Sequence, residues 1–274
     1  MLLKSADSKE ASLAILSNLA NHRSIPGEKK KQINRELLNV MKGIKTEKEA
    51  AYEIDFHFGA TKNFMVLHDL RLEMNGRVAQ IDHVIINRFC QVYVLETKTF
   101  GSGLLINDRG EFSTSSEGHT FGIPSPVEQN VRHIAVLRDA FKLIGMPKRF
   151  GFSIQPTFLP VVLVSQNAVI DRPDSKKSET DCVIKLDQFF SWFQKEIDET
   201  KAIDVMGILK FCKSETLQQL AEKLVALHRP LRIDYIKKFD LSRDLLIKKI
   251  PEEILRDQIY DRKNNAESLK NSGN

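Results

Sequence analysis

Two carboxylates and a lysine lie in two neighbouring apolar stretches of this chain. Asp82 lies within VAQIDHVIIN, and Glu96 and Lys98 end the stretch QVYVLETK. Successive side chains of a β-strand point to opposite faces, so Glu96 and Lys98 share one face. The short link at residues 88–90 predicts an antiparallel hairpin, which can bring Asp82 to that same face.

These three side chains carry more negative charge than they can balance among themselves. Buried charges are costly unless they are paired or bound to a metal, and a divalent cation would correct the imbalance. Hard oxygen ligands, without a nearby cysteine or a pair of histidines, favour Mg²⁺ or Mn²⁺ over Zn²⁺. Such an ion would activate water and stabilise a phosphoryl group, with Lys98 assisting. On the residues alone, a plain salt bridge at a strand end remains open.

The surrounding pattern predicts an α/β fold with a mixed sheet flanked by helices. A three-strand meander is followed by a weaker strand at 104–107 and a polar, loop-like stretch at 108–125. An amphipathic helix at 126–144 precedes a continuous apolar run at 158–165, typical of a buried strand. The meander strands are expected at residues 63–69, 78–87 and 91–98.

A helix in front of the meander would bring a further acid to the protein body. Thr46 and Glu49 fit a capping box, which predicts that this helix begins at Thr46. Glu47 stands four residues before Ala51, so it shares the apolar face of the helix and points inward. An inward acid at the start of a helix needs a chemical reason.

Outside this region the patterns are mainly helical. We expect an N-terminal helical extension at 1–45, a core at 46–165, and a C-terminal helical region at 166–274. Ser214 is a suitable N-cap for a C-terminal helix. The polar tail at 261–274 is predicted to be disordered.

The composition excludes few classes of protein but agrees with a nucleic-acid partner. The formal net charge is +5, and a basic chain has a weak preference for polyanions. The three cysteines are far apart in sequence, which indicates neither a zinc ribbon nor a disulfide framework. Neither a signal peptide nor a membrane-spanning segment is evident, so a cytoplasmic location without membrane attachment is expected.

The stretch from Ala79 to Val84, followed by Val94 to Gly101, closely resembles the NERD family, the nuclease-related domain. That family is similar to PD-(D/E)xK nucleases with the restriction-endonuclease-like fold. The resemblance implies that Asp82, Glu96 and the carbonyl of Thr97 hold the metal, with Lys98 beside them. It covers roughly residues 43–144.

Two further matches come with departures from the family pattern. The family usually has a Gly-Glu pair on its first helix, where this chain reads Thr46-Glu47 and keeps only the acid. An Asn-Pro-x-x-Gln segment of the family corresponds to Ser125–Gln129, which keeps only the proline and the glutamine. The resemblance implies that Glu47 and Gln129 assist catalysis.

Two histidines offer alternative chemistry. His68-Asp69 resembles the pair of an HD phosphohydrolase, but it ends a predicted strand rather than lying on a helix, so a structural role is favoured. His133 lies one helical turn after Gln129. It fits a phosphate contact and a plain helix-surface residue about equally.

The sequence therefore predicts a Mg²⁺- or Mn²⁺-dependent nuclease, with DNA favoured over RNA as its substrate. Its catalytic set would be Glu47, Asp82, Glu96, Lys98 and Gln129. The rival hypothesis is a nucleic-acid-binding or scaffold module that keeps the nuclease fold without cutting. A third is a nuclease-like module within a larger DNA repair or defence assembly, silent without its partner.

Overall fold

The computed structural model describes residues 1–100, 103–116, 118–149, 151–173, 180–203 and 211–242. The chain divides into two compact units, each assembled from segments distant in sequence. The first unit consists of Met1–Asp7 and Lys45–Pro230, and the second of Ser8–Ile44 and Leu231–Asn274. None of the described helices has the length and apolar character needed to cross a membrane. The predicted disordered tail at 261–274 lies outside the described residues.

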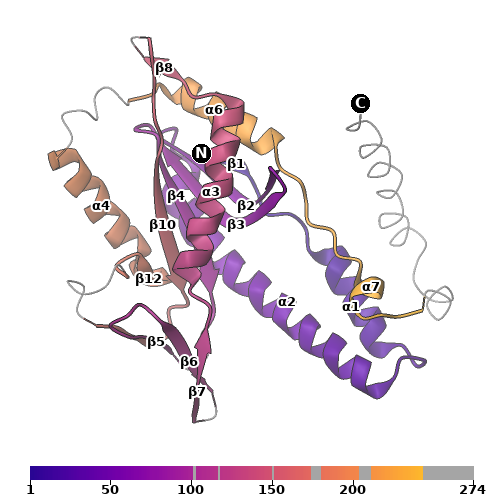
Figure 1. The fold of residues 1–274 in the computed structure, drawn as a ribbon. Coiled ribbons are helices and arrows are strands. Elements are labelled where there is room, and N and C mark those ends of the chain that lie inside the picture. The colour runs from indigo at the N-terminus through magenta and orange to yellow at the C-terminus, as the bar shows by residue number, and fades with distance from the viewer. Residues whose placement is uncertain (101–102, 117, 150, 174–179, 204–210, 243–274) are drawn as a thin grey trace. The chain divides into compact units, whose positions relative to one another are not determined.

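The first unit is built on a mixed sheet with the strand order β1-β2-β3-β4-β10-β12 (Figure 1). Strands β2, β3 and β4 form the predicted antiparallel meander. β10 pairs with β4, and β12 with β10, in parallel, while β1 pairs in parallel with β2. The α/β fold with a mixed sheet is therefore confirmed. The strands are β1 Leu2–Lys4, β2 Phe64–Met74, β3 Arg77–Asn87, β4 Gln91–Lys98, β10 Thr157–Val164 and β12 Val183–Lys185.

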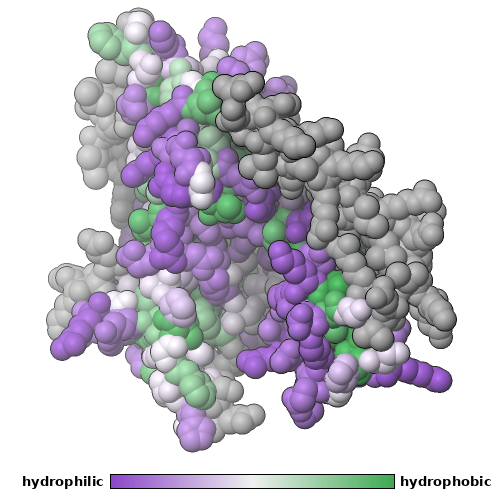
Figure 2. Space-filling model, turned by 45° about the vertical axis from the view of Figure 1, so that its right-hand side comes forward, coloured by the Kyte–Doolittle hydropathy of each residue, from purple (hydrophilic) through white to green (hydrophobic). Residues whose placement is uncertain are grey.

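Helices cover both faces of this sheet, which explains the nearly continuous apolar runs in β3 and β4. Val84 and Ile86 pack with α3 and α6, whereas Ile85 packs with the end of α2, the π-helix η1 and α4. The alternation thus divides one strand between two separate cores. These helical elements are α2 Gly27–Ile54, η1 Asp55–Gly59, α3 Pro126–Ile144, α4 Phe189–Ile203 and α6 Ser214–Ala226. Exposed hydrophobic residues on the face drawn in Figure 2 lie in small patches among hydrophilic ones.

The stretch predicted as a loop at 108–125 contains two strands, so that prediction was wrong. β6 and β7 form a hairpin in which Phe112 lies opposite Ile123, and Gly118 adopts a positive φ of 79°. Alternating apolar positions in a mostly polar stretch produced this hairpin. This hairpin belongs to a second sheet, with the strand order β11-β5-β6-β7. Its strands are β5 Leu104–Ile106, β6 Phe112–Ser116, β7 His119–Ile123 and β11 Ile170–Asp171, and a separate hairpin joins β8 Lys148–Arg149 to β9 Phe152–Ser153.

Four expectations for the helical regions also need correction. Helix α2 runs through Thr46 without interruption, so Thr46 is not an N-cap. Its hydroxyl instead forms a hydrogen bond with that of Thr99, just beyond β4. The start of the chain forms β1 rather than continuing a helix, and β11 and β12 fall in the C-terminal region that was expected to be helical. Helix α6 begins at Ser214, with Lys213 at the N-cap position.

The second unit has a small apolar core of its own. Helix α1 Glu10–Asn21 contributes Leu16 and Leu19, and α7 Tyr235–Lys238 contributes Tyr235. Ile33 comes from the part of α2 that belongs to this unit. None of the residues predicted to carry chemistry lies in it.

Candidate active site

Strand register brings Asp82 and Glu96 together. His83 lies opposite Leu95 in the antiparallel pair of β3 and β4. The next step of that register places Asp82 opposite Glu96, with both side chains on one face. Asp82 Oδ2 accepts hydrogen bonds from the backbone nitrogen of Thr97 at 2.7 Å and from its hydroxyl at 2.6 Å. Two donors from β4 therefore fix the Asp82 carboxylate in place.

Glu96, Lys98 and Gln129 form a closed triangle of hydrogen bonds. Lys98 Nζ lies 2.6 Å from Glu96 Oε1 and 3.1 Å from Gln129 Oε1. Gln129 Nε2 donates to the same Glu96 oxygen at 2.7 Å. Helix α3 thus delivers Gln129 to the carboxylate and lysine at the end of β4.

Both acids of this site hold protons more tightly than usual. Burial, assisted by the negative charge of Asp69, raises the pKa of Asp82 against the opposing Thr97 hydrogen bonds and Lys98. Burial and the charge of Asp82 raise the pKa of Glu96 to about 7. The single positive charge of Lys98 does not compensate for two carboxylates, of which Glu96 is buried and Asp82 is partly buried.

One oxygen of Glu96 is buried without a hydrogen-bond partner among the described residues. This oxygen, Oε2, faces His133 Nδ1 at 3.6 Å, and that nitrogen is also buried and unsatisfied. Burial, with the charges of Lys98 and Arg132, lowers the pKa of His133 to about 4, so the imidazole is neutral at pH 7. Unsatisfied buried polar atoms are costly, and a ligand or water that satisfied them would be stabilising.

The donor set fits a hard divalent cation that retains other ligands. Two carboxylates with raised pKa values and an unsatisfied oxygen are typical of a site that lacks positive charge. Within the described part of the chain, no group of three or more His, Cys, Asp or Glu side chains is arranged to hold a metal. Mg²⁺ commonly binds one or two carboxylates and completes its coordination with water and substrate phosphate.

Thr97 lies within the candidate active site, whereas Glu47 lies on a helix segment that approaches it. Glu47 is half-buried on α2 and follows Thr46, which contacts Thr99 beyond β4. That contact places the helix segment carrying Glu47 near the end of β4. Thr97 lies between Glu96 and Lys98 and holds Asp82 through its own nitrogen and hydroxyl.

Sequence reasoning missed Asn130, which positions the α3 residues of the site. Its side chain is fully buried and donates to the carbonyls of Val94 at 2.6 Å and Val161 at 3.0 Å. One amide therefore ties α3 to β4 and β10, with Gln129 beside it. The signal was present, because Asn130 lies four residues before Ile134 on the apolar stripe of the helix.

His68 and His83 belong to a chain of hydrogen bonds of their own. Their Nδ1 atoms lie 2.7 Å apart, and His68 Nε2 lies 3.1 Å from Asp55 Oδ1. Burial lowers the pKa of both imidazoles. This packing agrees with the structural role favoured from the sequence.

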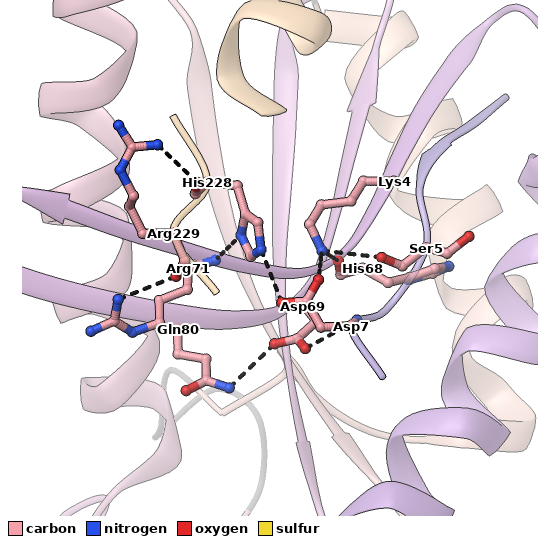
Figure 3. Close-up of polar contacts among 9 residues, drawn as sticks. All are labelled: Lys4, Ser5, Asp7, His68, Asp69, Arg71, Gln80, His228 and Arg229. Carbon is pink, nitrogen blue, oxygen red and sulfur yellow. Dashed lines mark hydrogen bonds and ion pairs between the residues drawn. The ribbon is translucent and has the colours of Figure 1, made fainter. Parts of the chain in front are cut away.

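A second polar cluster surrounds Asp7 on the same sheet (Figure 3). Lys4 Nζ lies 2.9 Å from Asp7 Oδ1, and His228 Nε2 lies 2.9 Å from Asp7 Oδ2. The backbone nitrogen of Arg71 donates to His228 Nδ1 at 3.1 Å, so the imidazole proton on Nε2 points to Asp7. Burial alone would raise the pKa of Asp7, but Lys4 and His228 together lower it.

Asp69 belongs to the Asp7 cluster, and its charge also raises the pKa of Asp82 in the candidate active site. It adopts a positive φ of 52° within β2 and is 4 % exposed. Its carboxylate accepts from Gln80 Nε2 at 3.2 Å and from the backbone nitrogen of Asp7 at 3.3 Å. The strained backbone is thus held by contacts from both sides.

Comparison with known proteins identifies one family. Residues 42–165 match the family model of the nuclease-related domain. This range contains all five residues predicted for catalysis and confirms the resemblance inferred from the sequence. Searches of curated proteins and of solved structures found no match.

Proposed function

We propose that this protein hydrolyses phosphodiester bonds of nucleic acid with Mg²⁺ or Mn²⁺, and that DNA is favoured over RNA as its substrate. The match of residues 42–165 to the nuclease-related domain supports this proposal. The observation that carries the proposal is the pair of opposed carboxylates, Asp82 and Glu96, both with raised pKa values beside one lysine. A nuclease needs such excess negative charge to bind its metal and a nearby cation for the reacting phosphate.

Asp82, Glu96 and the carbonyl of Thr97 would hold the metal. When bound, the ion would lower the pKa of a water molecule and stabilise charge on the phosphoryl oxygens. Glu47 is proposed to add a further carboxylate from α2.

The chain's own donors would orient the reacting groups. The side chain of Lys98 is 32 % exposed, whereas that of Glu96 is 5 % exposed. Lys98 can therefore reach a phosphate or a water while still contacting Glu96. Gln129 holds the ammonium group from the other side and would orient the attacking water.

Metal binding by calorimetry is the primary test. Wild-type protein should bind Mn²⁺, and the double variant Asp82→Asn/Glu96→Gln should lose this binding. Glu128→Gln is a matched control, since Glu128 is exposed beside Gln129 and the same isosteric change leaves the site intact. Equal binding by wild type and the double variant, or none by either, would remove the metal site from the proposal.

Cleavage is then measured on double-stranded DNA, single-stranded DNA and RNA with Mg²⁺ or Mn²⁺. Asp82→Ala and Lys98→Ala should each abolish cleavage that chelation also abolishes. If both variants cut as well as wild type, the activity comes from elsewhere and the assignment is wrong.

The arrangement of Glu96 also supports a second candidate, a module that binds nucleic acid without cutting. Glu96 Oε1 is engaged by Lys98 and Gln129, and Oε2 faces the buried His133. Oε1 must therefore give up a hydrogen bond before it can bind an ion, and Oε2, which has no hydrogen-bond partner among the described residues, is buried. Nucleic-acid binding that weakens with salt but needs no metal would favour this candidate.

A further inference from the structure

Two cysteines far apart in sequence meet in the first unit. Cys90 lies in the turn between β3 and β4, and Cys212 lies just before α6. Their sulfur atoms are 3.2 Å apart, and the two residues are separated by 122 positions. Cys90 is 0 % exposed and Cys212 is 3 % exposed.

Hydrogen bonds hold the segments that carry Cys90 and Cys212 against each other. The nitrogen of Cys212 donates to the carbonyl of Arg88 at 2.7 Å, and Arg88 Nε donates back to the carbonyl of Cys212 at 2.9 Å. Arg149 adds a hydrogen bond from Nη1 to the carbonyl of Phe211 at 2.9 Å. The sulfur atoms are thus brought together by fixed backbone on both sides. Moving each sulfur by well under 1 Å would reach the bonding distance of about 2.05 Å.

The two thiols differ in their access to small reagents. Cys212 lines a cavity of about 650 Å³ whose walls include Arg88, Lys148, Arg149 and Lys213. Cys90 is not among the residues that line this cavity. The hydrogen bond with Cys90, together with the charges of Arg149 and Arg88, lowers the pKa of the Cys212 thiol against the raising effect of burial. A positively charged environment favours the reactive thiolate.

We propose that Cys90 and Cys212 are a site of oxidation by hydroperoxides, in which Cys212 reacts first and Cys90 closes a disulfide. The Cys212 thiolate attacks a peroxide oxygen, forming a sulfenic acid and releasing hydroxide, or an alkoxide from an organic hydroperoxide. The Cys90 sulfur then attacks the Cys212 sulfur and displaces water. The thiols are oxidised by two electrons in total, and the peroxide O–O bond is reduced.

The cross-link would fasten the β3–β4 turn to the segment that enters α6. The loop that it closes contains Glu96, Lys98 and Gln129, although the cysteines contact none of them. Closing a loop of this length restricts the unfolded chain strongly. The oxidised protein should therefore melt at a higher temperature than the reduced protein, by about 5 °C or more.

Intact mass and peptide mapping of the full chain test the proposal. After treatment with a few equivalents of hydrogen peroxide, the mass should fall by about 2 Da, the mass of two hydrogen atoms. Non-reducing digestion should yield one linked pair containing Cys90 and Cys212, which dithiothreitol separates. This measurement on the wild type needs no variant that must fold.

Variants assign the order of reaction. Cys182→Ser should behave like wild type, since Cys182 packs in a different core cluster. In Cys90→Ser, Cys212 should accumulate as a sulfenic acid that dimedone traps. Three results would overturn the proposal: addition of oxygen to Cys212 without a cross-link in wild type, a link that involves Cys182, or thiols that survive peroxide sufficient to oxidise free cysteine.

Discussion

The candidate active site and the Asp7 cluster use the same chemical groups on the same sheet with opposite electrostatic results. In the Asp7 cluster one carboxylate faces both Lys4 and His228, and its pKa is lowered. In the candidate active site Asp82 and Glu96 share Lys98, and the pKa of each is raised. A carboxylate with enough partners stabilises the fold as an anion, whereas two carboxylates with one cation are suited to bind another cation.

The largest expected difference between the clusters is in cleavage. Lys98→Met should reduce the rate of DNA cleavage by about 10³-fold, because it removes the charge that is proposed to contact the reacting phosphate. Lys4→Met removes a lysine of equal length from the other cluster and should leave the specific rate unchanged. Single-turnover cleavage at saturating metal measures both. Equal losses in the two variants would mean that Lys98 acts only through folding.

The loss of folding stability should be larger for Lys4→Met than for Lys98→Met, the reverse of the order in cleavage. Lys4→Met should lower the free energy of unfolding by about 3 kcal/mol, since it strips Asp7 of an ion-pair partner whose ammonium is largely buried. Lys98→Met should cost less, because Glu96 has a pKa near 7 and can take up a proton instead. Urea unfolding of metal-free protein at pH 6 measures both values. A larger loss for Lys98→Met would contradict this assignment of roles.

The proximity of Asp82, Glu96 and Lys98 could be predicted from the sequence, whereas the Asp7 cluster could not, because the two groups depend on contacts of different range. Asp82, Glu96 and Lys98 belong to one short hairpin, whose register follows from the turn length and the two-residue period of a strand. Asp7 and His228 are separated by 221 positions. Their contact depends on packing of β1 and the segment after α6, which no local pattern records.

Local signals also failed where a tertiary contact overrode them. The Thr46-x-x-Glu49 pattern is typical of a helix start, yet a single helix continues through it and Thr46 binds Thr99. Cys90 and Cys212 gave no pairing signal, because their proximity is created by the turn and the α6 entrance. Asn130 was recognisable in principle, since a polar residue on an apolar stripe indicates a buried hydrogen bond.

The next largest expected difference is in the pH dependence of stability, which should have opposite signs for Glu96 and Asp7. The folded pKa of Glu96 is raised, so its contribution is present below its unfolded pKa and is lost as pH rises through about 7. Relative to Glu96→Gln, metal-free wild type should lose on the order of 2 kcal/mol between pH 5 and 8. The folded pKa of Asp7 is lowered, so its contribution is present above the unfolded value and is lost as pH falls through the folded pKa.

Both pH dependences are measured by chemical unfolding, from strong acid up to pH 8. Asp7→Asn should differ from wild type in stability above pH 4, and the difference should shrink only in stronger acid. A wild-type stability curve parallel to that of Glu96→Gln from pH 5 to 8 would show that Glu96 is already ionised, and the charge imbalance of the site would be refuted. Saturating Mn²⁺ should abolish the loss at high pH, because the ion binds the ionised carboxylates.

The smallest expected effect is the difference in cleavage rate between two glutamine variants. Gln129 contacts Glu96 in the candidate active site, and Gln80 contacts Asp69 in the Asp7 cluster. Gln129→Ala should lower cleavage by about tenfold, since Gln129 positions Lys98 and Glu96 without supplying charge. Gln80→Ala removes one 3.2 Å hydrogen bond to Asp69 and should leave cleavage within experimental error. The Mn²⁺ affinity of Gln129→Ala should stay near that of wild type or rise, because Glu96 Oε1 loses a competing donor. Loss of Mn²⁺ binding in this variant would mean that Gln129 shapes the metal site itself, and its role in orienting the attacking water would have to be abandoned.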